Sequence, residues 1–117
     1  MTDQTIFCDI AFDFDNVIHQ YSQGWKDGQI YDPPMRHCEK VLDKLYKDYK
    51  LCIFTTRENL ASVMSWLRKY NLDKYFKHVT NKKPVAKMYV DDRAVHFDDW
   101  LSFYAKFDEH IKLLYEK

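Results

Sequence analysis

Glycine is scarce in this chain of 117 residues, and neither sign of charge prevails. Average usage would give about eight glycines, whereas the sequence has 2, both within residues 19–34, which we therefore expect to form a loop. The 18 Lys and Arg residues balance 18 Asp and Glu residues. Nucleic-acid and membrane surfaces attract an excess of positive charge, so this balance argues against either partner.

Long apolar runs, a secretory signal and paired cysteines are also missing. No apolar run approaches the roughly 18–20 residues that cross a bilayer. Residues 1–5 lack the basic start and apolar stretch of a signal peptide. The three cysteines, Cys8, Cys38 and Cys52, form no Cys-x-x-Cys pair, which argues against a zinc site or a disulfide framework. We expect a cytoplasmic protein whose cysteines are small buried hydrophobic residues.

The sequence does have enough apolar material for one folded domain. Hydrophobic residues make up 46% of the chain and aromatic residues 17%, and the length fits a single domain over residues 1–117. Apolar segments typical of buried strands alternate with segments whose apolar residues recur at helical spacing. The strands are predicted at residues 6–14, 51–54, 78–80 and 87–90, and the helices over residues 38–49, 60–70 and 100–114.

This alternation of strands and helices is typical of an α/β fold. It predicts a Rossmann-like three-layer sandwich, with a central parallel sheet, helices on both faces and right-handed crossovers. In the last helix, Trp100, Tyr104 and Phe107 form an aromatic stripe that we expect to belong to the core.

Polar residues follow three of the predicted strands at the point where each strand ends. Because the carboxyl ends of parallel strands meet at one edge of a sheet, we expect these residues to line one crevice. Four carboxylates there repel one another unless a cation lies among them, and an all-oxygen set suits a hard ion such as Mg²⁺. Hydroxyls and a lysine beside that ion suit a phosphate group. The residues concerned are Asp13, Asp15, Thr55, Thr56, Asp91 and Asp92, with Lys83 on the loop before the last strand.

Four short motifs resemble those of the haloacid dehalogenase-like (HAD) phosphohydrolases. They occur in the family's order, and each lies at a strand end or just before a strand. The sequence has Asn16 where many members have Gly, and an Asp-Asp pair in the last motif where others have Gly-Asp, although the family also uses the pair. The motifs are Asp13-Phe14-Asp15-Asn16-Val17, Phe54-Thr55-Thr56-Arg57, Lys83-Pro84 and Tyr89-Val90-Asp91-Asp92-Arg93.

The resemblance implies a phosphatase that hydrolyses phosphomonoesters through an aspartyl-phosphate intermediate. Asp13 would be the nucleophile and a metal ligand. Asp15 would be the general acid and base, and its backbone carbonyl would also bind the metal. Thr55, the backbone N–H of Thr56 and Lys83 would hold the phosphoryl oxygens.

The same resemblance implies Mg²⁺ as the cofactor. Asp92 would be the third metal ligand, with Asp91 either binding through water or orienting its neighbour. The reverse assignment of these two aspartates stays open, and Lys82 is an alternative to Lys83 at the phosphate.

The spacing of the motifs leaves no room for a cap domain. An independent domain needs roughly 40 residues, and neither the segment after Asp15 nor that between Thr56 and Lys83 offers them. The resemblance therefore implies a capless member with an open site, covered only by the loop. On this loop Trp25 and Tyr31 either stack on a substrate ring or pack onto the body.

The partners that follow are a phosphorylated substrate and, as an open question, a second copy of the chain. A nucleotide or another small phosphate fits best, and an open site also admits a phosphate on a macromolecule. Arg57 and Arg93 either bind a second substrate charge or form surface ion pairs.

Two other functions compete with the phosphatase. A response-regulator receiver also uses an acidic pair, a phospho-accepting Asp, a Thr and a Lys-Pro, but there the acidic pair comes first, whereas Asp91 and Asp92 follow Lys83 here. A catalytically idle relative would bind phosphate or a signalling partner without turning it over.

Overall fold

The computed structural model describes residues 5–115, apart from the side chains of residues 108, 110 and 113–115. Within this range, no helix is long and apolar enough to cross a membrane. The elements in chain order are β1 (Phe7–Phe12), α1 (Cys38–Leu45), β2 (Leu51–Phe54), α2 (Leu60–Lys69), the short 3₁₀ helix η1 (Asp73–Tyr75), β3 (Phe76–Thr80), β4 (Val85–Val90) and α3 (Trp100–Tyr115).

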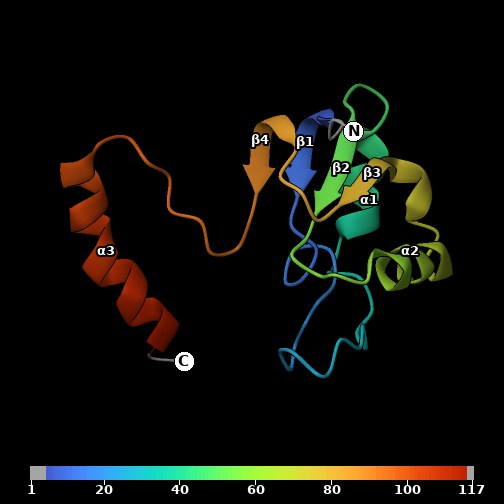
Figure 1. Ribbon diagram of the computed structural model, residues 1–117, viewed down its shortest axis with the longest axis horizontal. Coiled ribbons are helices and arrows are strands. Elements are labelled where there is room, and N and C mark those ends of the chain that lie inside the picture. Colours follow the sequence, from blue (N-terminus) through green and yellow to red (C-terminus); the bar gives the residue numbers. More distant parts are fainter. Residues whose placement is uncertain (1–4, 116–117) are drawn as a thin grey trace.

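The strands form one parallel sheet in the order β3-β2-β1-β4 (Figure 1). The predicted α/β class with a central parallel sheet is confirmed. The element bounds differ modestly from those predicted: β3 and β4 begin earlier, at Phe76 and Val85, and α1 ends at Leu45 and not near residue 49.

One face of the sheet is covered by α1 and α2, and the main core lies beneath these helices. The steps from β1 to β2 and from β2 to β3 run in the same direction, so right-handed crossovers place both helices on the same face. Both helices are amphipathic and turn their apolar residues toward the strands. The buried residues that meet there include Phe12, Leu51 and Ile53 from the strands, Leu42 from α1, and Val63, Trp66 and Leu67 from α2.

The second face of the sheet carries no helix among the described residues, which corrects the prediction of helices on both faces. Its buried residues, Cys8, Ala11 and Cys52, all come from strands. Only residues 81–84 join β3 to β4, and this connection is too short to contain a crossover helix. Because β3 and β4 are the two edge strands, the connection crosses the sheet (Figure 1). The prediction of small, buried cysteines is confirmed for the two on this face.

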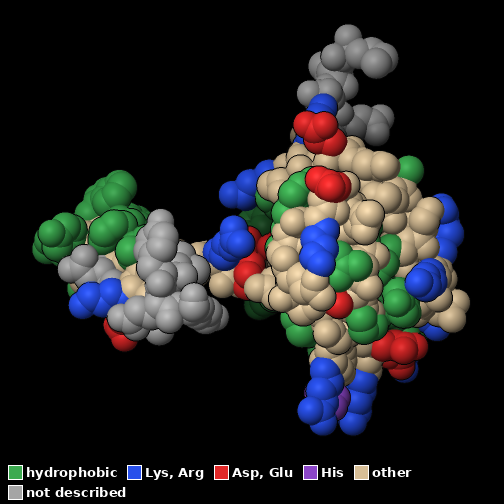
Figure 2. Space-filling model, turned by 90° about the horizontal axis from the view of Figure 1, so that it is seen from below, with side chains coloured by type: hydrophobic (Ala, Val, Ile, Leu, Met, Phe, Trp, Pro, Cys, Tyr) green, Lys and Arg blue, Asp and Glu red, His purple; other side chains and the backbone are tan. Residues whose placement is uncertain are grey.

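The last helix, α3, stands apart from the sheet and is joined to β4 by residues 91–99 (Figure 1). Its side chains Trp100 and Tyr104 are 75% and 73% exposed, and Phe107 is exposed as well. Figure 2 shows hydrophobic side chains gathered on this separate segment. The prediction that the aromatic stripe belongs to the core is therefore wrong. The helical period was sufficient to predict the helix, but residues 91–99 lead it away from the face that it was expected to cover.

Candidate functional site

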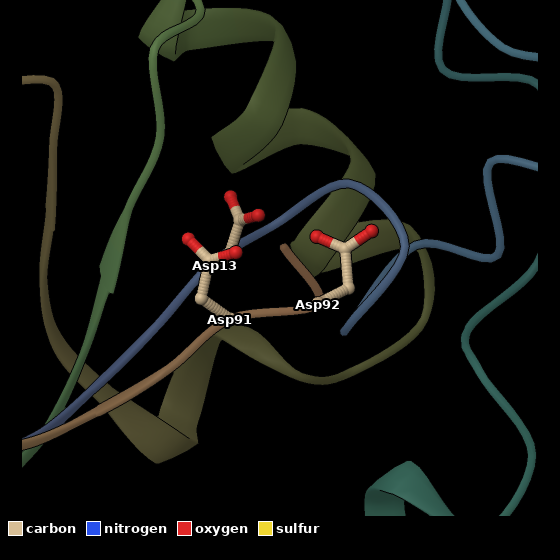
Figure 3. Close-up of side chains that lie close together, drawn as sticks. All are labelled: Asp13, Asp91 and Asp92. Carbon is tan, nitrogen blue, oxygen red and sulfur yellow. The ribbon is translucent and has the colours of Figure 1, made fainter. Parts of the chain in front are cut away.

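Three carboxylates meet where β1 and β4 end. In the parallel pairing of these strands Phe12 lies beside Val90, and the N–H of Asp13 donates to the Val90 carbonyl at 2.9 Å. The residues that follow, Asp13 on one strand and Asp91 and Asp92 on the other, are therefore neighbours. One oxygen from each of the three carboxylates lies within 4.8 Å of the others (Figure 3). The convergence predicted from the strand ends is found for these three residues.

Asp13 is the most buried member of this acidic cluster. Burial, the largest cause, together with the charges of Asp91, Asp92 and Asp15, raises the pKa of Asp13 to about 6. A hydrogen bond from the Phe14 N–H, at 2.8 Å, acts in the opposite direction. Half-burying a carboxylate among other carboxylates is unfavourable, and a cation between them would relieve the repulsion. The donor set is all oxygen, which fits a hard divalent ion.

Asp91 and Asp92 are exposed, and neighbouring groups orient both of them. Asn16 has a left-handed backbone with φ of 67°, which Asn tolerates better than most residues, and its amide donates to Asp92 at 2.8 Å. This residue therefore adopts the conformation usually given to Gly and adds a contact of its own. The Arg93 N–H donates to Asp91 at 2.7 Å. Both aspartates belong to the cluster, so both remain candidates for the direct ligand.

The carboxylate of Asp15 is turned away from the cluster and toward Arg57. The guanidinium makes a bidentate contact, with Nε and Nη2 donating to the two Asp15 oxygens at 2.8 and 2.9 Å. His19 lies at 2.9 Å from the same carboxylate through Nδ1. Because the Asp32 N–H donates to His19 Nε2, the ring proton is on Nδ1 and points to Asp15. Asp15 thus accepts three hydrogen bonds.

Arg57 and His19 are the contributors that sequence reasoning missed. Both side chains are buried, with 5% and 0% of the residue exposed. Arg57 was expected either to bind a substrate charge or to form a surface ion pair, and it forms a buried one. The available signals were its place directly after the Thr55-Thr56 strand end and the position of His19 four residues after Asp15.

The two threonines at the end of β2 differ in position. Thr55 is buried, and its hydroxyl accepts the Arg57 N–H at 3.2 Å. Thr56 is exposed and lines a cavity of about 270 Å³ that also contains the acidic cluster, Tyr21 and Arg93. Of the two threonines, Thr56, whose backbone N–H was predicted to hold a phosphoryl oxygen, is the one that lines this cavity.

Lys83 does not line that cavity. Its ammonium lies 5.0 Å from the centre of the Tyr89 ring, whose hydroxyl donates to the Pro84 carbonyl. The cause is topological: residues 81–84 lead to the first residue of β4, which lies at the amino ends of the strands. The carboxylates lie at the carboxyl ends.

Comparison with known proteins gave no match to this chain among family models, curated proteins or solved structures. The resemblance to the HAD phosphohydrolases therefore rests on the four motifs alone.

Proposed function

We propose that this protein is a Mg²⁺-dependent phosphomonoester hydrolase of the HAD type, with Asp13 as the nucleophile. The observation that carries the proposal is the acidic cluster: Asp13, Asp91 and Asp92 bring three oxygens within 4.8 Å at the carboxyl edge of a parallel sheet. Ligands of open α/β sheets bind at this edge. The motif order supports the choice of reaction, because a cluster of carboxylates that can bind a metal ion does not by itself specify phosphoryl transfer.

The residues present fit the ion that the proposal requires. Mg²⁺ takes one or two protein carboxylates together with phosphate oxygens and water; Asp13 with Asp92 or Asp91 would supply the carboxylates, and the substrate and water would supply the rest. When bound, Mg²⁺ supplies positive charge against the transferring phosphoryl group. Arg93 lines the same cavity, so we assign to it part of the charge compensation that the resemblance gives to Lys83. Thr56, an exposed residue that lines this cavity, is assigned the phosphoryl oxygens, and Thr55 supports the turn through its hydrogen bond from the Arg57 N–H.

The proposed reaction has two steps. A carboxylate oxygen of Asp13 attacks phosphorus while the bond to the leaving oxygen breaks, and that oxygen takes a proton from Asp15. Water then attacks the aspartyl-phosphate: Asp15 accepts its proton, the new P–O bond forms, and the bond to Asp13 breaks to release phosphate. The Asp15 carboxylate accepts three hydrogen bonds from Arg57 and His19, so in the first step it would turn from Arg57 toward the acidic cluster and carry the proton that the leaving oxygen takes.

The test is hydrolysis of 4-nitrophenyl phosphate with Mg²⁺ and with EDTA. Turnover should require the metal and should be abolished in Asp13→Asn. The matched control is Asp48→Asn, because Asp48 is an exposed acid outside the cavity, and its activity should equal that of the wild type. Undiminished turnover in Asp13→Asn would refute the assignment. A stable phosphorylated protein without turnover would instead favour the receiver-like or idle alternatives.

A further inference from the structure

A second cavity of about 460 Å³ adjoins the one that holds the acidic cluster. The two cavities share Asp15, Tyr21 and Thr56 as walls. Its volume falls within the roughly 300–1,000 Å³ of small-molecule sites. A phosphate held by the cluster would direct its leaving oxygen toward Asp15, the proposed acid. The remainder of the substrate would then extend past these three shared residues into the second cavity.

An aromatic side chain is presented in this second cavity. Trp25 is 62% exposed, although it is the kind of side chain that usually packs inward. The Arg57 guanidinium lies 5.0 Å from the centre of its ring. Tyr31, the other aromatic residue that sequence reasoning considered for stacking, packs onto the body: its ring contacts His19 at 5.3 Å and its hydroxyl donates to the Gly24 carbonyl.

The loop that carries Trp25 is held in place by several hydrogen bonds. Arg57 Nη1 donates to the Gly28 carbonyl at 2.9 Å, so the same side chain that binds Asp15 also fixes the loop. The Gln23 N–H donates to the Tyr31 hydroxyl at 2.8 Å. The backbone on both sides of Trp25 is therefore held before any ligand arrives, which lowers the entropy that binding must overcome.

We propose that the second cavity binds the nucleoside of a nucleoside monophosphate, with the base stacked on Trp25. This inference rests on the proposed function, which places the phosphate at the acidic cluster. A planar base covers the exposed indole, whereas a sugar phosphate without a base leaves it in water. Glu58 also lines the cavity, and a carboxylate there accepts hydrogen bonds from ribose hydroxyls. A second phosphate is disfavoured, because the Arg57 charge is already paired with Asp15.

The experiment compares kcat/KM for AMP with that for ribose 5-phosphate, which differ only in the base. The wild type should favour AMP, and Trp25→Ala should reduce this ratio at least about fivefold, the lower range of base stacking on an aromatic side chain. Trp25→Phe should restore most of it. The matched control is Trp100→Ala, because Trp100 is an exposed tryptophan on α3, and it should leave the ratio as in the wild type.

The outcomes separate this inference from the proposed function. Equal kcat/KM for AMP and ribose 5-phosphate, or an unchanged ratio in Trp25→Ala, overturns the nucleoside site. Hydrolysis of either substrate in that case still supports the proposed phosphatase activity. Hydrolysis of 4-nitrophenyl phosphate but of neither AMP nor ribose 5-phosphate also overturns the nucleoside site. If none of the three phosphates is hydrolysed, the proposed function fails, and the nucleoside site is then judged by quenching of tryptophan fluorescence. Quenching by AMP that Trp25→Ala loses supports the site, whereas equal quenching by ribose 5-phosphate overturns it.

Discussion

Replacing Arg57 with Ala should destabilise the protein by about 3 kcal/mol. Removing one partner of a buried ion pair costs about 3–5 kcal/mol, because the other charge is left without compensation. The Arg57 side chain is 4% exposed and that of Asp15 is 20% exposed, so water screens Asp15 in part. His19 also remains as a donor to the same carboxylate. Both facts place the loss at the lower end of the range.

The measurement is urea unfolding followed by circular dichroism. For a domain of this length, about 3 kcal/mol corresponds to a fall in Tm of roughly 10 °C, and the midpoint should move without a change in the m-value. Arg57→Lys keeps a charge but not the bidentate geometry, so it should fall between the wild type and Arg57→Ala.

Arg68→Ala is the matched control, because Arg68 is an exposed arginine of α2. It should lie within about 0.5 kcal/mol of the wild type. If Arg57→Ala and Arg68→Ala lose the same free energy of unfolding, the buried pair does not exist in solution, and the account of Asp15 given above is wrong.

Three further predictions concern the acidic cluster. Because the pKa of Asp13 is raised from 3.8 to about 6, the folded state holds a proton on Asp13 that the unfolded chain has lost. In EDTA the contribution of Asp13 to the free energy of unfolding should therefore fall as pH rises from about 4 to 6. Asp13→Asn should lack this slope in urea titrations across that range. At neutral pH, about 10 mM Mg²⁺ should raise the Tm of the wild type by mass action but not that of Asp13→Asn; equal shifts would place the ion elsewhere. Asn16→Ala should lower the free energy of unfolding by about 1 kcal/mol, because position 16 has a left-handed backbone. Asn16→Gly should leave the free energy of unfolding nearly unchanged. It should reduce only the rise in Tm caused by Mg²⁺, because the contact to Asp92 is lost.

The sequence was sufficient to predict the features that depend on local pattern. Strand β2 was predicted with the bounds that it has, because four apolar residues are followed at once by polar ones. The meeting of Asp13 with Asp91 and Asp92 follows from strand polarity alone, since neighbouring parallel strands end at the same edge of the sheet. No detailed packing was needed for either prediction.

The features that were missed depend on how distant segments pack. The spacing of apolar residues predicts that residues 100–114 are helical, but it does not specify which surface, if any, they pack against. The partner of Arg57 could not be read from its sequence neighbours, because Asp15 is 42 positions away. Lys83 was expected at the phosphate because of its motif, whereas the short connection to β4 places it beside Tyr89.

The acidic pair and the outlying helix belong to one continuous stretch of backbone. Asp91 and Asp92 are the first residues of segment 91–99, which leads to α3. Two members of the acidic cluster are therefore joined through this segment to a helix of 16 residues. The first residue of β1 lies at the amino ends of the strands, away from these two aspartates. If the protein is attached to a surface through a tag placed after α3, a pulling force therefore reaches Asp91 and Asp92 directly through residues 93–99. If it is attached ahead of β1, the sheet lies between the point of attachment and the acidic cluster.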